Sequence, residues 1–275
     1  MMKKVMVVLA MAGALLMSVS VLAKVQKSQR KKTTSVTKRI SKTVDCPDTV
    51  IVNGISFEMV KVEGGTFEMG ATPDQGGDTK FDESPAHQVV LRGYSIAKTP
   101  VTQRLWVAVM GENPSTFKGD SLPVDHVSWS DCQLFIKKLN TLTGLAFRLP
   151  TEAEWEFAAR GGNCTQGYMY AGGNDIDSVA WYGVNSAKTT HPVGLKSPNE
   201  LGLYDMSGNL WEWCSDWFGD YQPGHQRNPQ GASDGFWRSV RGGSWIFDAN
   251  GCRVASRRGY EPDERSDDTG FRLAH

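Results

Sequence analysis

Arg241-Gly242-Gly243-Ser244-Trp245 is the stretch of sequence that decides the fold, and a lone cysteine, Cys252, lies seven residues beyond its tryptophan. Glycine has no Cβ, so a glycine pair is typical of backbone that turns tightly or lies very close to another part of the molecule. Cys-Arg-Val-Ala at 252–255 and Gly-Phe-Arg-Leu at 270–273 complete this C-terminal run. We therefore predict a close backbone approach at the glycine pair.

Three helices are predicted upstream of this run. The clearest begins at a capping box, in which the Thr151 side chain accepts from an amide at the helix start and Glu154 reaches back. A second helix is expected over residues 102–110 with Thr102 as its cap, and a third from a serine at 128 or 130 to about residue 140.

Strands are predicted over residues 50–61, 64–70 and 87–96, where apolar and polar residues alternate. After residue 160 this periodicity fades, and the segment is rich in Gly, Asn, Asp and Trp. All nine tryptophans lie between Trp106 and Trp245. So many large aromatic residues predict a compact domain with little regular secondary structure.

Composition divides the chain into three parts. Residues 1–23 are typical of a secretory signal peptide, because Lys3 and Lys4 precede an apolar run too short to span a bilayer comfortably. Residues 24–45 are rich in Lys, Arg, Ser and Thr and predict a basic, disordered linker, since little of this segment can be buried. Residues 46–275 are long enough for one large domain.

This organisation predicts an exported protein, either periplasmic, secreted or held at the cell surface, with no transmembrane span after signal cleavage. The alternatives are an uncleaved membrane anchor and a linker that contacts anionic lipid or polymer. The whole chain has thirty basic and thirty acidic residues, but residues 1–45 hold ten of the basic ones and one acidic one. The domain therefore has twenty basic and twenty-nine acidic residues, which argues against a nucleic-acid partner.

The five cysteines and five histidines show no spacing typical of a metal or redox motif. There is no CxxC pair and no HxxxH or HxH, so neither a zinc ribbon nor a histidine-built iron site is supported. Cys252 is either buried as a small apolar group or bonded to Cys214. Cys132 and Cys164 are a second candidate pair, and sequence alone does not set the connectivity.

Residues 64–70, 148–162 and 202–213 carry further motifs, among them Gly202-Leu203-Tyr204-Asp205-Met206. Together with the C-terminal run, these blocks resemble the formylglycine-generating enzymes, also called sulfatase-modifying factors. The resemblance extends over roughly residues 50 to 274. It implies a single α+β domain related to C-type lectins, with low regular secondary structure and often with calcium.

In active members of that family, two cysteine thiolates hold a copper(I) ion, which together with oxygen converts a sulfatase cysteine to formylglycine. The resemblance places the second thiolate on Cys252 and the first on Phe247, which cannot bind a metal. It places the serine of the oxygen pocket on Ser244, a nearby tryptophan on Trp211, and Asp268 where the family has asparagine. The chain is therefore expected to be a paralogue that lacks one active-site cysteine, in which Cys252, Ser244 and Trp211 are catalytic only if activity remains.

The resemblance also implies a calcium site, for which Asp205, Asn209 and Glu212 have the family's spacing. Calcium prefers carboxylate, amide and backbone carbonyl oxygens, and backbone oxygens near Ser207 would complete the set. The alternative is that Asp205 and Asn209 only stabilise a turn, as these residue types often do.

A ligand groove is expected along the C-terminal run, which borders the substrate groove of the family. The predicted groove residues are Trp245, Phe247, Asp268 and Arg257. Charges alternate densely in the same stretch, at Arg253, Arg257, Arg258, Glu261, Asp263, Glu264, Arg265, Asp267, Asp268 and Arg272. These charges are either the rim of a groove for a polar or peptide ligand or a mesh of surface ion pairs.

We therefore expect a binding module whose lectin-like groove recognises a peptide, a glycan or a protein at a cell surface. One alternative is a formylglycine-generating oxidase, which requires a second thiol close to Cys252. Another is the ligand-binding variable protein of a diversity-generating retroelement, because such proteins use this scaffold and vary this C-terminal stretch. An ergothioneine-type sulfoxide synthase is the least supported alternative.

Overall fold

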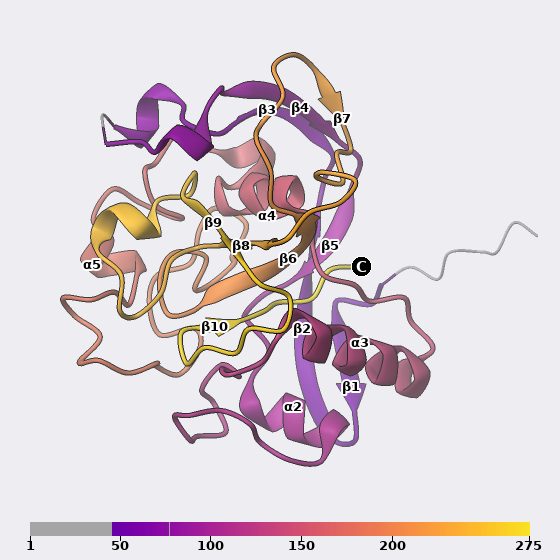
Figure 1. Cartoon of the computed structure of the whole chain (residues 1–275). Coiled ribbons are helices and arrows are strands. Elements are labelled where there is room, and N and C mark those ends of the chain that lie inside the picture. Colours follow the sequence, from indigo (N-terminus) through magenta and orange to yellow (C-terminus); the bar gives the residue numbers. More distant parts are fainter. Residues whose placement is uncertain (1–45, 77) are drawn as a thin grey trace, which may run out of the picture. The chain divides into compact units, whose positions relative to one another are not determined.

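Three small sheets form the frame of the domain in the computed structural model, which describes residues 46–76 and 78–275 (Figure 1). The strands are β1 (Thr49–Val52), β2 (Ile55–Val62), β3 (Gly65–Met69), β4 (His87–Leu91), β5 (Tyr94–Ala97), β6 (Trp211–Trp217), β7 (Gln226–Arg227), β8 (Arg238–Arg241), β9 (Arg257–Tyr260) and β10 (Thr269–Gly270). They pair in the orders β1-β2-β5, β3-β4-β7 and β10-β6-β8-β9. The predicted signal peptide and basic linker lie outside the described residues.

Short helices lie between and beside the sheets. The α-helices are α2 (Gln103–Met110), α3 (Trp129–Thr143), α4 (Glu152–Ala159) and α5 (Ile176–Val179). The 3-10 turns are η1 (Pro73–Gln75), η2 (Phe81–Glu83), η3 (Gly162–Cys164) and η4 (Ala249–Cys252). The prediction of an α+β domain with little regular structure after residue 160 is confirmed, because that part holds only one-turn helices and short strands.

The predicted helix starts are confirmed. Thr102 caps α2 by accepting from the amide of Leu105, and Thr151 and Glu154 form both bonds of the capping box of α4. Ser128, rather than the serine at 130, caps α3. This helix ends at Thr143, slightly beyond the expected residue 140.

Two of the predicted strands are each divided in two. Residues 50–61 form a hairpin, in which β1 and β2 pair antiparallel around Asn53 and Gly54 at φ 47° and 80°. Residues 87–96 form β4 and β5, which belong to different sheets. The alternation of inward-facing residues changes phase at both breaks, from 50 and 52 to 55 and 57 and from 89 and 91 to 94 and 96. The Asn-Gly pair is itself a strong hairpin signal, because both residues tolerate positive φ.

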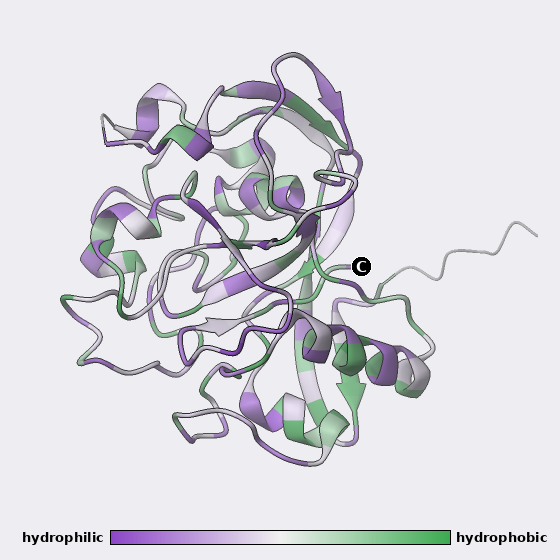
Figure 2. Ribbon diagram, viewed as in Figure 1, coloured by the Kyte–Doolittle hydropathy of each residue, from purple (hydrophilic) through white to green (hydrophobic). Residues whose placement is uncertain are grey.

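The core consists of three buried clusters. One lies between the β1-β2-β5 sheet, α2 and α3, where Trp106 stacks on Phe135 with ring centroids 5.1 Å apart. Figure 2 shows the alternation of apolar and polar residues around α3 that matches this one-sided burial. A second cluster packs α4 against β3 and β4, and a third surrounds Cys252.

Helix α4 is buried along its whole length, and this burial explains the arginines of the C-terminal run. Its glutamates Glu152 and Glu156 have to be paired, because an isolated buried charge costs several kcal/mol. Arg257 binds Glu152 through two bonds of 2.7 Å, and Arg241 binds both glutamates.

Two further arginines of the run form the same kind of pair. Arg253 makes two bonds of 2.7 Å to Glu83, and Arg272 makes bonds of 2.6 and 2.7 Å to Glu212. The prediction of a surface mesh or a groove rim is therefore wrong for Arg253, which is 2 % exposed, whereas Arg272, which directly follows Phe271, is structural as expected and is 0 % exposed. Among the described residues, none of the helices is long and apolar enough to cross a membrane.

Candidate functional site

The glycine pair brings the backbone directly against Cys252, as the sequence predicts. Gly242 and Gly243 have φ of 100° and 76°, which L side chains rarely adopt. A Cβ on Gly243 would lie 2.7 Å from the Cys252 sulfur, and one on Gly242 would lie 3.0 Å from the ring of Trp155. Only glycine fits at both positions.

Cys252 lies at the end of η4 as a buried thiol. Asp248 caps this turn and accepts from the amide of Gly251 at 2.9 Å. The Cys252 side chain packs among Tyr170, Tyr182 and their apolar neighbours. Burial, together with the charge of Asp248, raises the pKa of Cys252 to about 12. At neutral pH the group is therefore a thiol, whereas metal binding and nucleophilic attack need the thiolate.

The other cysteines do not approach Cys252. All five are free, so the candidate bridges from Cys214 to Cys252 and from Cys132 to Cys164 are not formed. Cys132, Cys214 and Cys252 belong to three different core clusters, and Cys164 is exposed. Within residues 46–76 and 78–275, no group of three His, Cys, Asp or Glu side chains is placed to hold a metal. A protonated thiol without a second thiol nearby does not fit a two-thiolate copper(I) site.

Phe247 occupies the position that the family resemblance gives to the other thiolate. Its ring meets the buried Trp211 edge to face, with centroids 5.3 Å apart and planes at 86°. The guanidinium of Arg258 lies 5.0 Å above the Phe247 ring on the solvent side. An aromatic ring therefore fills the space beside Trp211, whose Nε1 has no hydrogen-bond partner among the described residues.

Ser244 and Asp268 form a buried polar pair behind this ring. The Ser244 hydroxyl donates to the Asp268 carboxylate at 3.1 Å, and the hydroxyls of Ser266 and Thr269 donate to its other oxygen. Asp268 is 6 % exposed and does not line the surface hollow that Phe247 borders. Its expected contact with a ligand in the groove is therefore not direct in this structure.

A wide hollow of about 640 Å³, which we call the Phe247 groove, lies in front of Phe247. Its lining residues are Lys80, Asp82, Ile246, Phe247, Asp248, Asn250, Gly251, Arg257 and Arg258. A neighbouring cavity of about 330 Å³ is lined by Gly183, Lys188, Trp245 and Ile246. Of the predicted groove residues, Phe247 and Arg257 line the groove, and Trp245 lines the cavity beside it.

Ile246 is the residue that the linings of the two hollows share, and its apolar side chain is 57 % exposed. Val184, which follows the lining residue Gly183, and Phe81, which lies between Lys80 and Asp82, are 81 % and 91 % exposed. Sequence reasoning did not identify these three residues. Phe81 belongs to a loop far away in sequence, and a single apolar residue carries no signal of its exposure.

Arg257 forms part of the groove wall but is already bound. Besides Glu152, its guanidinium donates to the backbone oxygens of Asp82 and Gly219 at 3.0 and 2.8 Å. Arg258 is exposed and forms no ion pair among the described residues. The guanidinium of Arg258 lies over the rings of Phe247 and Tyr260, so its charge, unlike that of Arg257, is not paired with a carboxylate of the described residues.

The residues of the predicted calcium site lie close together but are differently engaged. Both carboxylate oxygens of Glu212 are bound by Arg272, and one also accepts from Trp155 Nε1 at 2.7 Å. The Asp205 carboxylate accepts from the amide of Gly194 and from the side chain of Asn209 at 2.8 and 3.3 Å. Glu212 therefore does not fit the role of a calcium ligand while Arg272 holds both of its carboxylate oxygens.

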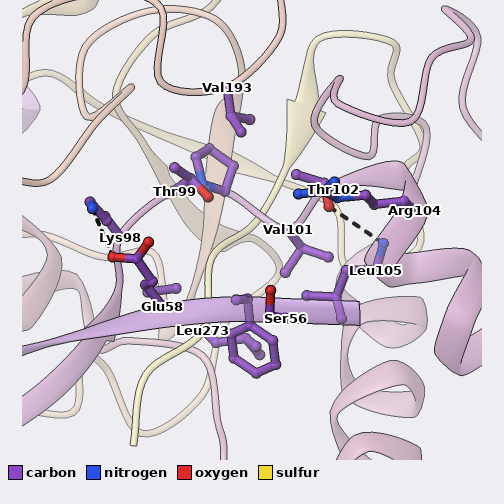
Figure 3. A pocket seen from close by; sticks show the side chains of 13 residues that line it. Ser56, Glu58, Lys98, Thr99, Val101, Thr102, Arg104, Leu105, Val193 and Leu273 are labelled. Atoms are coloured by element: carbon purple, nitrogen blue, oxygen red, sulfur yellow. Dashed lines mark hydrogen bonds and ion pairs between the residues drawn. The ribbon is translucent and has the colours of Figure 1, made fainter. Parts of the chain in front are cut away.

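Another cavity, of about 220 Å³, lies between β2 and the segment that leads into α2 (Figure 3). Figure 3 shows Lys98 paired with Glu58 on one side and Arg104 and Thr102 on the other. The hydroxyl of Thr102 already caps α2, and the Lys98–Glu58 pair is exposed. This cavity shares no lining residue with the Phe247 groove.

The model of the sulfatase-modifying factor enzyme 1-like domain matches residues 52–275. The chain belongs to this family. It is 30 % identical to the chaperone protein LppX of Paenibacillus barcinonensis, over 80 % of the chain and 89 % of that protein. It is 32 % identical to the formylglycine-generating enzyme of Streptomyces coelicolor, over 78 % of the chain and 88 % of that protein.

A solved structure of high similarity is Treponema denticola variable protein 1. It superposes with a TM-score of 0.76 at 33 % identity, over 82 % of this chain and 97 % of that one. The expected fold family is thereby confirmed. The relatives carry different functions in their names, so membership of the family does not by itself assign a reaction.

Proposed function

We propose that this protein is an exported binding module that holds an extended peptide segment of a partner protein in the Phe247 groove, without oxidase chemistry. The observation that carries the proposal is the pairing of Phe247 with Cys252. The first residue is an aromatic ring where the family's chemistry needs a thiolate, and the second is a thiol whose pKa is raised to about 12. Copper oxidation needs two thiolates at these positions.

The surface around the pair supports a peptide ligand. Ile246 exposes an apolar side chain in the groove wall, and Phe81 is an exposed neighbour in the chain of the lining residues Lys80 and Asp82. Exposed apolar surface rimmed by polar residues is typical of interaction sites. Lys80 and Arg258 line the same groove and supply hydrogen-bond donors for the backbone and acidic side chains of a peptide. The name of one relative, a chaperone protein, is in keeping with a protein ligand.

A random peptide library displayed on phage tests this proposal. Peptides selected on the full chain are expected to bind at least tenfold more weakly to Ile246→Glu, which puts a charge on the apolar part of the groove. The matched control is Leu142→Glu on α3, because Leu142 is 51 % exposed and lies outside the groove. Equal binding to Ile246→Glu, or no enrichment of peptides beside enrichment on a glycan array, would overturn the peptide assignment.

The oxidase is the second candidate, because the family resemblance assigns Ser244 and Trp211 to the oxygen pocket and the backbone amide of Ser244 hydrogen-bonds the Cys252 sulfur. It predicts that a cysteine-containing sulfatase peptide gains an aldehyde when incubated with the protein, copper(I) and oxygen. Mass spectrometry of the peptide distinguishes this outcome from unchanged cysteine. The third candidate, a variable protein of a retroelement, has the likeness to the Treponema protein in its favour, and a template repeat beside the gene would identify it.

A further inference from the structure

A second, smaller cavity lies on the other side of Arg257 from the Phe247 groove. It has a volume of about 150 Å³. It lies between β3 and β4 on one side and residues 216–232, which run from the end of β6 through β7, on the other. Arg257 and Glu152 close one side of it, and Met69 and Ala153 contribute apolar walls. We call it the Asp216 cavity, after the buried carboxylate that lines it.

Asp216 is 3 % exposed, and among the described residues only one of its oxygens has a hydrogen-bond partner. Its Oδ2 accepts from the Glu152 amide at 3.0 Å and from the Ser215 hydroxyl at 2.8 Å. Its Oδ1 faces Gly231, on which a Cβ would lie 3.0 Å away. No ion pair of the described residues includes Asp216.

The charged neighbours of Asp216 are bound elsewhere. Arg257 and Arg241 pair with Glu152, so neither is left for Asp216. Arg238 is held between the rings of Trp129 and Trp217, 3.9 and 3.4 Å from their centroids, and donates to the backbone oxygen of Ser215. Arg238 acts on Asp216 through its charge but forms no ion pair with it, so among the described residues Asp216 is a buried carboxylate without an ion-pair partner. Burial next to Glu152 raises its pKa to about 7.

The mouth of the cavity offers further acceptors. Gln222 and Gln226 line it and donate through Nε2 to backbone oxygens, which leaves their amide oxygens as acceptors. An ammonium group has three donors and no acceptor, so it matches a carboxylate oxygen together with amide oxygens. The apolar walls suit the methylene stem that leads to such a group.

We propose that the Asp216 cavity binds a primary alkylammonium group, with its nitrogen on Asp216 Oδ1 and its stem against Met69 and Ala153. Two sources share this chemistry, the side chain of a lysine in a peptide and a free alkylamine. The site is separate from the Phe247 groove and does not depend on the function proposed for that groove.

Titration of the full chain with n-butylammonium tests the proposal, with binding followed by NMR shifts or calorimetry and with 1-butanol as the uncharged control. We expect saturable binding of n-butylammonium, no matching binding of 1-butanol, and at least tenfold weaker binding to Asp216→Asn. Asparagine keeps an oxygen that accepts from the Glu152 amide, so the start of α4 is preserved. Asp234→Asn, at an exposed residue that does not line the cavity, is the matched control and is expected to bind within twofold of the unchanged protein.

Ala232→Phe gives an independent test if Asp216→Asn fails to fold. Ala232 is exposed and lines the cavity, so a phenyl ring there fills the space without entering the core and is expected to abolish binding. Tighter binding of N-acetyl-lysine amide than of n-butylammonium points to a peptide lysine, and the reverse order points to a free amine. Equal binding of n-butylammonium and 1-butanol, or unchanged binding to Asp216→Asn, would overturn the proposal.

Discussion

The interior of the domain and the Phe247 groove satisfy their polar groups in different ways. In the interior, Arg241, Arg253, Arg257 and Arg272 each bind a glutamate at close range, and all four are at most 2 % exposed. Near the groove, the buried Trp211 Nε1 has no hydrogen-bond partner among the described residues, and Cys252 is a buried thiol without a charged partner bound to it. Arg258 is exposed and lies over the Phe247 ring.

This difference shows which residues of the family motifs maintain the fold. The glutamates of α4 and the arginines of the C-terminal run lie in the blocks that carry the resemblance, and they form the ionic frame of the fold. The positions of the family's thiol pair, which correspond to Phe247 and Cys252 here, take no part in these ion pairs and are not needed to hold the fold together. A chain of this family can therefore keep its fold with one of the two thiols replaced.

The largest effect is expected when one partner of an interior pair is removed. Arg272→Met leaves Glu212 as an unpaired buried carboxylate, which should lower the free energy of unfolding by about 3–5 kcal/mol. Urea denaturation measures the loss. Adding Glu212→Gln, which removes the charge and keeps an acceptor for Trp155, should recover part of it. A loss as small as that of an exposed pair would contradict the importance of the ionic frame.

The carboxylate of Asp216 is expected to make stability depend on pH. Its pKa is raised from 3.8 to about 7 in the folded state, so it stabilises the fold fully below about pH 3.8, and this contribution is lost as pH rises towards 7. The slope it adds is at most about 1.4 kcal/mol per pH unit. In Asp216→Asn, thermal denaturation between pH 4 and 7 should lack this component. An unchanged pH profile would show that Asp216 is ionised in the folded protein throughout this range.

Replacing the buried thiol is expected to have a smaller effect. Cys252→Ala removes one buried heavy atom, for which about 0.5–1.5 kcal/mol of stability is usual. Binding of the peptides selected on the groove should stay unchanged, because Cys252 is buried and does not line the groove. Lost binding at unchanged stability would instead assign Cys252 a direct role in the site.

The smallest effect is expected at the exposed pair of Lys98 and Glu58, whose side chains are 35 % and 58 % exposed. Such pairs contribute about 0–1 kcal/mol, because water screens them and two long side chains lose freedom. Lys98→Ala, compared with Arg272→Met in the same urea series, therefore calibrates the contrast between surface and interior. A larger loss in the free energy of unfolding for Lys98→Ala than for Arg272→Met would contradict this contrast.

Local signals in the sequence predicted local structure well. The capping box at Thr151 and Glu154 and the close approach at Gly242 and Gly243 both depend on residues adjacent in the chain, and both are present. The Asn53-Gly54 hairpin was missed because the strand prediction followed the apolar residues on both sides and passed over the turn signal of the Asn-Gly pair. The irregular part after residue 160 was recognised by its composition and its motifs rather than by periodicity.

The ion pairs of the interior were not predictable from these signals. Arg253 and Glu83 are 170 residues apart in the chain, and Arg257 and Glu152 are 105 apart. The alternation of charges around residue 257 is typical of an exposed segment. Nothing in the neighbouring sequence distinguishes an arginine that points inwards from one that points outwards. The exchange of a thiol for Phe247 and a buried Cys252 were both expected from the sequence, but the choice between a free thiol and a bridge to Cys214 required the fold.

A copper(I) titration of the full chain, in competition with a chromogenic chelator, tests the central claim most directly. The account predicts no tight one-to-one binding that depends on Cys252, because Phe247 cannot supply the second thiolate. Phe247→Cys is the matched control, since it restores a thiol at this position and should gain copper(I) binding. Tight one-to-one binding by the unchanged protein that disappears in Cys252→Ser would contradict the account and return the protein to the oxidases.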